Sequence, residues 1–198
     1  SMLAYSDFRA AARYREAALE RAAVLATTPW PEFVPGNDIV DLAFAQKESH
    51  WKRKGYLDKI FTQKEQLLIL NSKNPTSMVW NLWSRKEAAY KIYNRQTQIR
   101  GYFPLQLECY DLEIIDGFIF GKVVIKDQIY YTKTAINPEF IHTIAVQNSR
   151  DLSRIIILKT RKNIQKNNGI PNYFEKENSV PSPVSISHHG RFEQIISI

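Results

Sequence analysis

Two acidic residues in this sequence have neighbours that favour the binding of a cation together with a phosphate. The first is Asp38, which opens an extended run two residues after Gly36. A carboxylate near a glycine can approach a metal ion or a phosphate closely, because no side chain crowds it. An isolated aspartate near a turn is more often a cap or a turn former. Asp38 therefore becomes a candidate ligand only in combination with other residues.

The second acid lies in the stretch WSRKEAAYK, residues 83–91. Glu87 and Lys91 are four residues apart and share one face of a helix. Such a pair is commonly a surface ion pair worth only about 0.3–0.5 kcal/mol. Trp80 and Trp83 fall on the same face, so we expect the acid and the base to be half-buried. A half-buried acid beside a base, near a second acid from a strand, can hold a hard cation and a phosphate together.

A third polar group stands near the C-terminus, in the stretch SISHHGR of residues 185–191. In a strand, Ser185, Ser187 and His189 face one way and the residues between them face the other way. Hydroxyls, an imidazole and an arginine are typical of a phosphate-binding edge. A zinc site is disfavoured, because adjacent histidines on a strand point to opposite faces and Cys109 is the only cysteine.

The elements that position these groups follow from turn and cap signals. Gly36 to Leu42 is predicted as a short strand that enters a helix. Phe61 to Asn71 is predicted as a helix, with Thr62 as its N-cap and Glu65 at the capping-box spacing. Asn74 followed by Pro75 predicts a second helix, which runs to about Tyr93.

The second half of the chain has a strand pattern. We predict strands from Leu105 to Val146, with Gly117 and Gly121 as turn points. Three further expectations follow from spacing and composition: a helix at Asp151 to Lys166, a loop at Asn167 to Pro183, and a strand or hairpin at Ser185 to Ile198.

Residues 1–35 differ from the rest of the chain. Asp7 to Ala26 is predicted as an alanine-rich helix, and the prolines of residues 27–35 predict a stiff linker after it. We interpret this segment as a helical arm appended to the remainder of the chain. The alternative is an ordinary N-terminal helix that packs on the domain.

The composition is that of a globular protein, with 44% hydrophobic residues in a chain of 198. The formal net charge of +7 favours a polyanionic partner, such as a nucleotide, a nucleic acid or an acidic protein, without choosing between them. A lone cysteine excludes an intrachain disulfide, and no apolar run approaches the length of a membrane span. We expect a cytoplasmic protein.

Taken in order, the stretches GNDIVDL, KIFTQKE and WSRKEAAYK resemble the signature of the 4′-phosphopantetheinyl transferase superfamily. That signature consists of a Gly-x-Asp strand, a Phe/Leu-Thr/Ser-x-x-Glu helix start, and Trp-x-x-Lys-Glu-Ala-x-x-Lys on a helix. The resemblance implies an α+β fold, with an antiparallel sheet packed against helices. It also implies a holo-acyl-carrier-protein synthase activity, which moves the phosphopantetheine arm of coenzyme A onto a carrier serine and releases adenosine 3′,5′-bisphosphate.

The roles of individual residues carry over from the same resemblance. Asp38 and Glu87 correspond to the Mg²⁺ ligands, and Glu87, directly or through a water, to the base. Contacts with coenzyme A are implied for four residues: Lys86, Lys91, Ser187 and His188. The expected partner is an apo acyl carrier protein or a related carrier domain of fatty-acid, polyketide or peptide synthesis, with no nucleic acid and no membrane.

Two departures from the pattern of the larger members of the superfamily affect the expected site and assembly. Those members carry a second acid two residues after the strand aspartate, where this chain has Val40, so we expect two protein carboxylates at the metal. Their Ser-x-Ser-His element precedes the Gly-x-Asp strand, whereas here it follows, within residues 169–192. Residues 36–147 therefore resemble one complete half, and residues 150–198 resemble part of the other. We expect a rearranged pseudo-two-fold monomer, with a homotrimer as the alternative.

Two competing readings remain on sequence alone. A basic nucleic-acid-binding module fits the charge and the aromatic content, but it gives no reason for Glu87 between aligned lysines beside tryptophans. A carrier-binding protein without catalysis is the second alternative. The presence of Asp38, Glu87 and Lys91 together argues against it.

Overall fold

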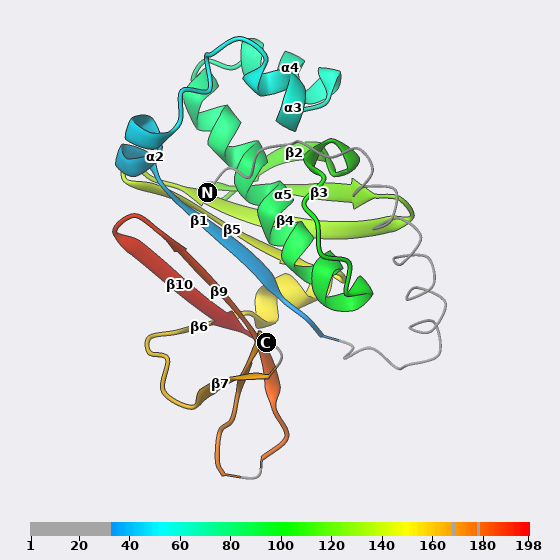
Figure 1. The fold of residues 1–198 in the computed structure, drawn as a ribbon, viewed down its shortest axis with the longest axis vertical. Helices are drawn as coiled ribbons and strands as arrows, with labels where there is room; N and C mark the ends of the chain where they lie inside the picture. The colour runs from blue at the N-terminus through cyan, green and yellow to red at the C-terminus, as the bar shows by residue number, and fades with distance from the viewer. Residues whose placement is uncertain (1–32, 168, 178) are drawn as a thin grey trace.

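The computed structural model describes residues 33–198, except residues 168 and 178. The helix expected at Asp7 to Ala26, and with it nearly all of the arm at residues 1–35, lies outside the described residues. The described chain forms two five-stranded antiparallel sheets and a small set of helices (Figure 1). This confirms the α+β class. Among the described helices, none is long and apolar enough to cross a membrane.

The first sheet has the strand order β1-β5-β4-β3-β2, so β1 is an edge strand. Its strands are β1 (Gly36–Asp41), β2 (Glu108–Ile115), β3 (Phe118–Ile125), β4 (Gln128–Ile136) and β5 (Phe140–Val146). The strand pattern predicted for residues 105–146 is confirmed, and Gly117 lies in the β2–β3 turn with a positive φ of 78°. Gly121 is not a turn point but a residue of β3. A Cβ there would come within 2.0 Å of the Arg85 guanidinium, which explains the glycine.

Four α-helices precede β2 in the described chain: α2 (Leu42–Glu48), α3 (Tyr56–Ile60), α4 (Gln63–Leu70) and α5 (Pro75–Thr97). The helix α4 begins with the predicted capping box, because Thr62 accepts from the backbone of Glu65 and the Glu65 side chain accepts from the backbone of Thr62. Asn74 caps α5 as predicted, and α5 runs four residues beyond Tyr93. A short 3₁₀ turn, η1 (Pro104–Gln106), leads from α5 towards β2.

The second sheet has the order β6-β10-β9-β8-β7 and contains the hairpin predicted near the C-terminus. Its strands are β6 (Ile156–Leu158), β7 (Ile164–Asn167), β8 (Ile170–Tyr173), β9 (Ser182–His189) and β10 (Phe192–Ser197). The helix predicted for residues 151–166 is wrong. That segment forms part of the 3₁₀ turn η2 (Ser149–Arg154) and then the strands β6 and β7. The loop predicted for residues 167–183 is also partly wrong, because it contains β8.

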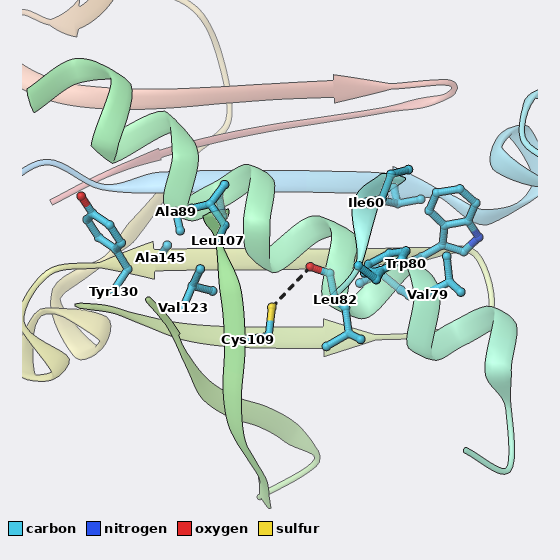
Figure 2. Packing of buried hydrophobic residues seen from close by; sticks show 14 of the residues in the cluster. Ile60, Val79, Trp80, Leu82, Ala89, Leu107, Cys109, Val123, Tyr130 and Ala145 are labelled. Carbon is cyan, nitrogen blue, oxygen red and sulfur yellow. Dashed lines mark hydrogen bonds between the residues drawn. The ribbon is translucent and has the colours of Figure 1, made fainter. Parts of the chain in front are cut away.

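The helix α5 lies across the first sheet and supplies much of the core (Figure 1). Leu82 and Ala89 of α5 belong to one buried cluster with Val123, Tyr130 and Ala145 of the sheet, and all five side chains are fully buried (Figure 2). The lone cysteine, Cys109, is buried in the same cluster, and its thiol donates to the Leu82 carbonyl at 3.7 Å. This core fixes α5 against the sheet and so fixes the position of every polar side chain on the helix.

Candidate functional site

The strand β1 approaches α5 more closely than a side chain would allow. A Cβ on Gly36 would lie 2.0 Å from the backbone oxygen of Ala88, so only glycine fits there. On the helix, the small side chains of Ala88 and Ala89 are fully buried. This contact brings Asp38 of β1 towards the polar face of α5.

Asp38, Glu87 and Lys91 lie together at this junction. The Lys91 ammonium is 3.7 Å from Asp38 Oδ1, and the carboxylate of Asp38 acts electrostatically on that of Glu87. The Lys91 ammonium also donates to the Asn37 carbonyl at 2.6 Å and to the Ile186 carbonyl at 3.4 Å. Lys91 therefore joins α5, β1 and β9 at one point, and its side chain is still 31% exposed.

Both carboxyl groups are held in a poorly solvated environment. Burial raises the pKa of Glu87 to about 8, with repulsion from Asp38 as the second cause and with Lys91 acting in the opposite direction. Burial raises the pKa of Asp38 to about 6, and Lys91 and a hydrogen bond from Ser187 oppose that rise. Both carboxyl groups are therefore harder to ionise than usual, which indicates that the site lacks enough positive charge to stabilise two carboxylates. A divalent cation would supply that charge.

An aromatic cluster borders Glu87. Tyr102 lies close enough to Glu87 for the two groups to interact electrostatically, and burial together with the Glu87 carboxylate raises the pKa of Tyr102 well above its usual range. The Tyr102 ring makes edge-to-face contacts with Trp83 at 5.7 Å and with Tyr90 at 5.1 Å, measured between ring centroids. These rings limit the access of water to Glu87 from that side.

The strand β9 contributes polar side chains along the open edge of β1. Ser185, Ser187 and His189 face the same way, as predicted, but they face β1. The backbone N–H groups of β1 residues donate to them: that of Asn37 to Ser185 Oγ at 3.0 Å, that of Ile39 to Ser187 Oγ at 3.0 Å, and that of Asp41 to His189 Nδ1 at 2.9 Å. Ser185, Ser187 and His189, which were predicted to form a phosphate-binding edge, instead form an internal junction between the two sheets.

His188 and Arg191 differ in their availability. His188 is exposed on the opposite face of β9 from Ser187. Arg191 makes a two-point contact with Asp41, with Nε donating to Oδ2 at 2.8 Å and NH2 to Oδ1 at 3.0 Å. It also lies 3.5 Å from Glu139. Arg191 thus closes the β9–β10 hairpin onto the start of α2, while His188 remains open to a ligand.

Lys86 does not reach this site. Its ammonium is fully buried and has three acceptors: Glu65 Oε1 at 2.6 Å, the Ile60 carbonyl at 2.7 Å and the Pro104 carbonyl at 2.8 Å. An ammonium has three protons to donate, so none is left for a phosphate. The sequence-based expectation that Lys86 contacts coenzyme A is therefore corrected. Lys86 ties α5 to α3 and to η1.

A hollow of about 210 Å³ opens beside Lys91. It lies between the C-terminal half of α5 and the strands β8 and β9, and Tyr90, Arg95, Pro171 and Ile186 are among its lining residues. The Arg95 guanidinium donates to the carbonyl of Pro171, so the strand that forms one wall is fixed to the helix. The hollow is large enough for part of a ligand whose charged end lies at Lys91.

Asp38 and Glu87 fit a Mg²⁺ site that has few protein ligands. Mg²⁺ is commonly bound by one or two carboxylates together with substrate phosphates and water. Asp38 and Glu87 provide such a pair, and Val40, which is 3% exposed, adds no third acid. Across residues 33–198, outside the two gaps, no three acidic, histidine or cysteine side chains gather into a metal cluster.

Two residues at this junction were not identified from the sequence. Tyr102 contacts Glu87 from a loop 15 residues later in the chain, and no periodic pattern connects the two. His142 of β5 is bonded through Nε2 to the Asn37 amide at 3.1 Å, and burial lowers its pKa to about 4. A neutral, buried histidine has no charge to offer a phosphate, so His142 supports β1 rather than a ligand.

Comparison with known proteins gives one family. Residues 35–122 match the model described as the 4′-phosphopantetheinyl transferase superfamily, which confirms the resemblance seen in the sequence. The matched segment contains Asp38, Glu87 and Lys91. The superfamily implies a transferase that moves phosphopantetheine from coenzyme A to a carrier protein. No curated protein matches the chain.

The buried position of Lys86 predicts a loss of stability when its charge is removed. Lys86→Met leaves the Glu65 carboxylate buried without its cation, and we expect the free energy of unfolding to fall by about 3–5 kcal/mol. Lys64→Met is the matched control, because Lys64 pairs with Glu108 at the surface and should cost less than about 1 kcal/mol. Urea unfolding measures both. Adding Glu65→Gln to Lys86→Met should restore part of the loss.

A different result would assign Lys86 to ligand binding. If Lys86→Met kept its stability and lost affinity for coenzyme A, the buried ion pair would not be its main role. Calorimetric titration of each stable variant with coenzyme A makes that distinction.

The raised pKa values of Asp38 and Glu87 predict that the metal-free protein becomes less stable as the pH rises. Between about pH 4 and pH 8 the unfolded chain releases protons that Asp38 and Glu87 retain in the folded chain, and this lowers the free energy of unfolding as the pH rises. His142, whose pKa burial lowers to about 4, opposes that fall below about pH 6.5, so the fall is steepest above it. Glu87→Gln should reduce this slope, whereas Gln at the exposed Glu113 should leave it unchanged. Urea unfolding in EDTA at pH 5 and pH 8.5 provides the comparison. An equal slope in Glu87→Gln and wild type would contradict the burial of an ionisable Glu87.

Proposed function

The chain contains a domain of the 4′-phosphopantetheinyl transferase superfamily, and we propose that it is an Mg²⁺-dependent holo-acyl-carrier-protein synthase. It transfers the 4′-phosphopantetheine arm of coenzyme A to a serine of an apo acyl or peptidyl carrier protein. Adenosine 3′,5′-bisphosphate is the second product. The observation that carries the proposal is the convergence of Asp38, Glu87 and Lys91 from β1 and α5.

The residues divide the chemistry between them. Asp38 and Glu87 would hold Mg²⁺, and the ion would supply positive charge next to the pyrophosphate of coenzyme A. Lys91 contributes a further positive charge at the same point, and 31% exposure of its side chain leaves it accessible to a phosphate oxygen. His188 adds an exposed imidazole on β9, and the hollow beside Lys91 offers room for the adjoining part of the cofactor.

The transfer is an in-line displacement at the β-phosphorus of coenzyme A. The carrier serine oxygen forms a bond to that phosphorus, and the bond between the phosphorus and the bridging oxygen breaks. Adenosine 3′,5′-bisphosphate leaves with that oxygen. Glu87 accepts the serine proton, and Tyr102 borders the Glu87 carboxyl group. Trp83 and Tyr90 hold the Tyr102 ring in place.

An acidic carrier protein is compatible with both the net charge of the chain and the residues of the candidate site, whereas a nucleic acid is compatible with the charge alone. The net charge of +7 favours an anionic partner. Two half-buried carboxyl groups at the candidate site have no role in binding a nucleic-acid backbone, whereas the transferase reaction uses both. We therefore retain the carrier protein as partner.

One assay tests the reaction directly. Wild-type protein, Mg²⁺, a fluorescent coenzyme A and an apo acyl carrier protein should give a labelled carrier on a gel, and a carrier with its serine replaced by alanine should give none. Asp38→Asn and Glu87→Gln should each reduce the rate at least about 100-fold with an unchanged circular dichroism spectrum. Glu113→Gln is the control and should retain the wild-type rate.

The outcomes separate the three readings. Labelling that persists in Asp38→Asn or Glu87→Gln would remove the metal-site assignment. Carrier binding without labelling would indicate the non-catalytic alternative. Binding of an oligonucleotide without either would support the nucleic-acid module.

We also propose that one chain makes the complete site. Lys91 joins α5 to β1 and β9 of the same chain, and Ser187 of β9 contacts Asp38 of β1 at 3.1 Å. No second copy is needed to bring these groups together. Light scattering should therefore give the mass of a monomer under conditions in which the carrier is labelled. A single active species at three times that mass would instead indicate a homotrimer.

A further inference from the structure

The hydroxyl of Ser187 makes two contacts at once. It accepts the backbone N–H of Ile39 at 3.0 Å and lies 3.1 Å from Asp38 Oδ1, to which it donates. A serine hydroxyl carries a single proton. Because the N–H of Ile39 fills an acceptor position, the proton of Ser187 is directed at the carboxylate. Ser187 is 5% exposed, so water competes little for either contact.

Both side-chain contacts of Asp38 use the same oxygen. Ser187 donates to Oδ1, and the Lys91 ammonium lies 3.7 Å from Oδ1. The backbone N–H of Ile39 also stabilises the Asp38 carboxylate. A carboxylate has about four acceptor sites, so these donors restrict the rotation of the carboxyl group about its Cβ–Cγ bond and leave acceptor capacity for a cation.

Ser185 provides an internal comparison within the same strand. Its hydroxyl accepts the N–H of Asn37 at 3.0 Å, the same distance as in the contact between Ser187 and Ile39, and it is 4% exposed. The two serines thus secure the backbone on each side of Asp38. The contact with the carboxylate itself distinguishes Ser187 from Ser185.

We propose that Ser187 is a positioning residue that orients Asp38 for the divalent cation, in place of the side-chain contact with coenzyme A expected from the sequence. This inference rests on the proposed function, because it requires Asp38 to be a ligand of the metal. A residue that orients a metal ligand commonly changes metal affinity by about 10–100-fold when it is removed. Loss of the Ser187 hydroxyl should therefore weaken metal binding even before coenzyme A is present.

The test compares Ser187→Ala with Ser185→Ala in the full chain, using Mn²⁺ as a probe that electron paramagnetic resonance detects. Each variant loses one acceptor for a β1 N–H, so urea unfolding should show a similar loss of stability in both. The dissociation constant for Mn²⁺ without coenzyme A should rise at least about 10-fold in Ser187→Ala and remain within about 2-fold of wild type in Ser185→Ala. Ser187→Thr keeps the hydroxyl and should recover most of the affinity.

The outcomes distinguish this inference from the proposed function. If wild type binds Mn²⁺ and Asp38→Asn does not, but Ser187→Ala binds as wild type does, the positioning role is wrong and the metal site stands. If Ser187→Ala weakens only the binding of coenzyme A in EDTA, its role is the ligand contact expected from the sequence. Equal weakening of Mn²⁺ binding in both serine variants would contradict the positioning role, because it would mean that β9 affects the metal only by stabilising β1. Absence of Mn²⁺ binding in wild type would overturn the inference and the metal site together.

Discussion

The open edge of β1 is the constraint on which the site depends, because its outward N–H groups are buried and need acceptors. A buried backbone donor without a partner costs about 1–3 kcal/mol, and an edge strand usually satisfies its donors with water or with another strand. Here side chains of β9 do so, at every second residue of both strands: Ser185, Ser187 and His189. A shift of β9 by one residue would turn all of these acceptors away from β1. The register that completes the edge is therefore also the register that brings Ser187 to Asp38.

The same strand has to pack closely on α5, and that requirement accounts for the small residues at the contact. Gly36 leaves room for the Ala88 carbonyl, and this spacing allows Lys91 to reach the backbone of β1. Asp38 and Glu87 become largely shielded from water as a result, and each becomes harder to ionise. The metal-free protein thus tolerates an arrangement that lowers its own stability at neutral pH, a pattern common at sites that bind a cation.

Much of the fold could be predicted where local signals act alone. The capping box at Thr62, the Asn74–Pro75 helix start and the C-terminal hairpin depend on neighbours in sequence, and the structure has all three. The segment 151–166 could not be predicted in this way. Its apolar residues have helical spacing, but Ile155, Ile156 and Ile157 are three consecutive β-branched residues, which favour a strand once β10 offers an edge to pair with. Pairing with a strand almost 40 residues away is a tertiary effect, and no local pattern reports it.

The candidate site shows the same division between local and tertiary information. Glu87 and Lys91 are four residues apart, and at about 100° per residue they point within about 40° of each other on α5, so spacing alone places them together. Lys86 is adjacent to Glu87 and therefore points about 100° away from it. In that direction the Lys86 ammonium contacts the Glu65 carboxylate and two backbone carbonyls in the protein interior. The two lysines that flank Glu87 in the motif thus differ in what they contact: one holds α5 to the elements beneath it, and the other faces the junction of β1 and β9. A motif identifies which residue types are present, and the helical angle decides which of them can meet a substrate.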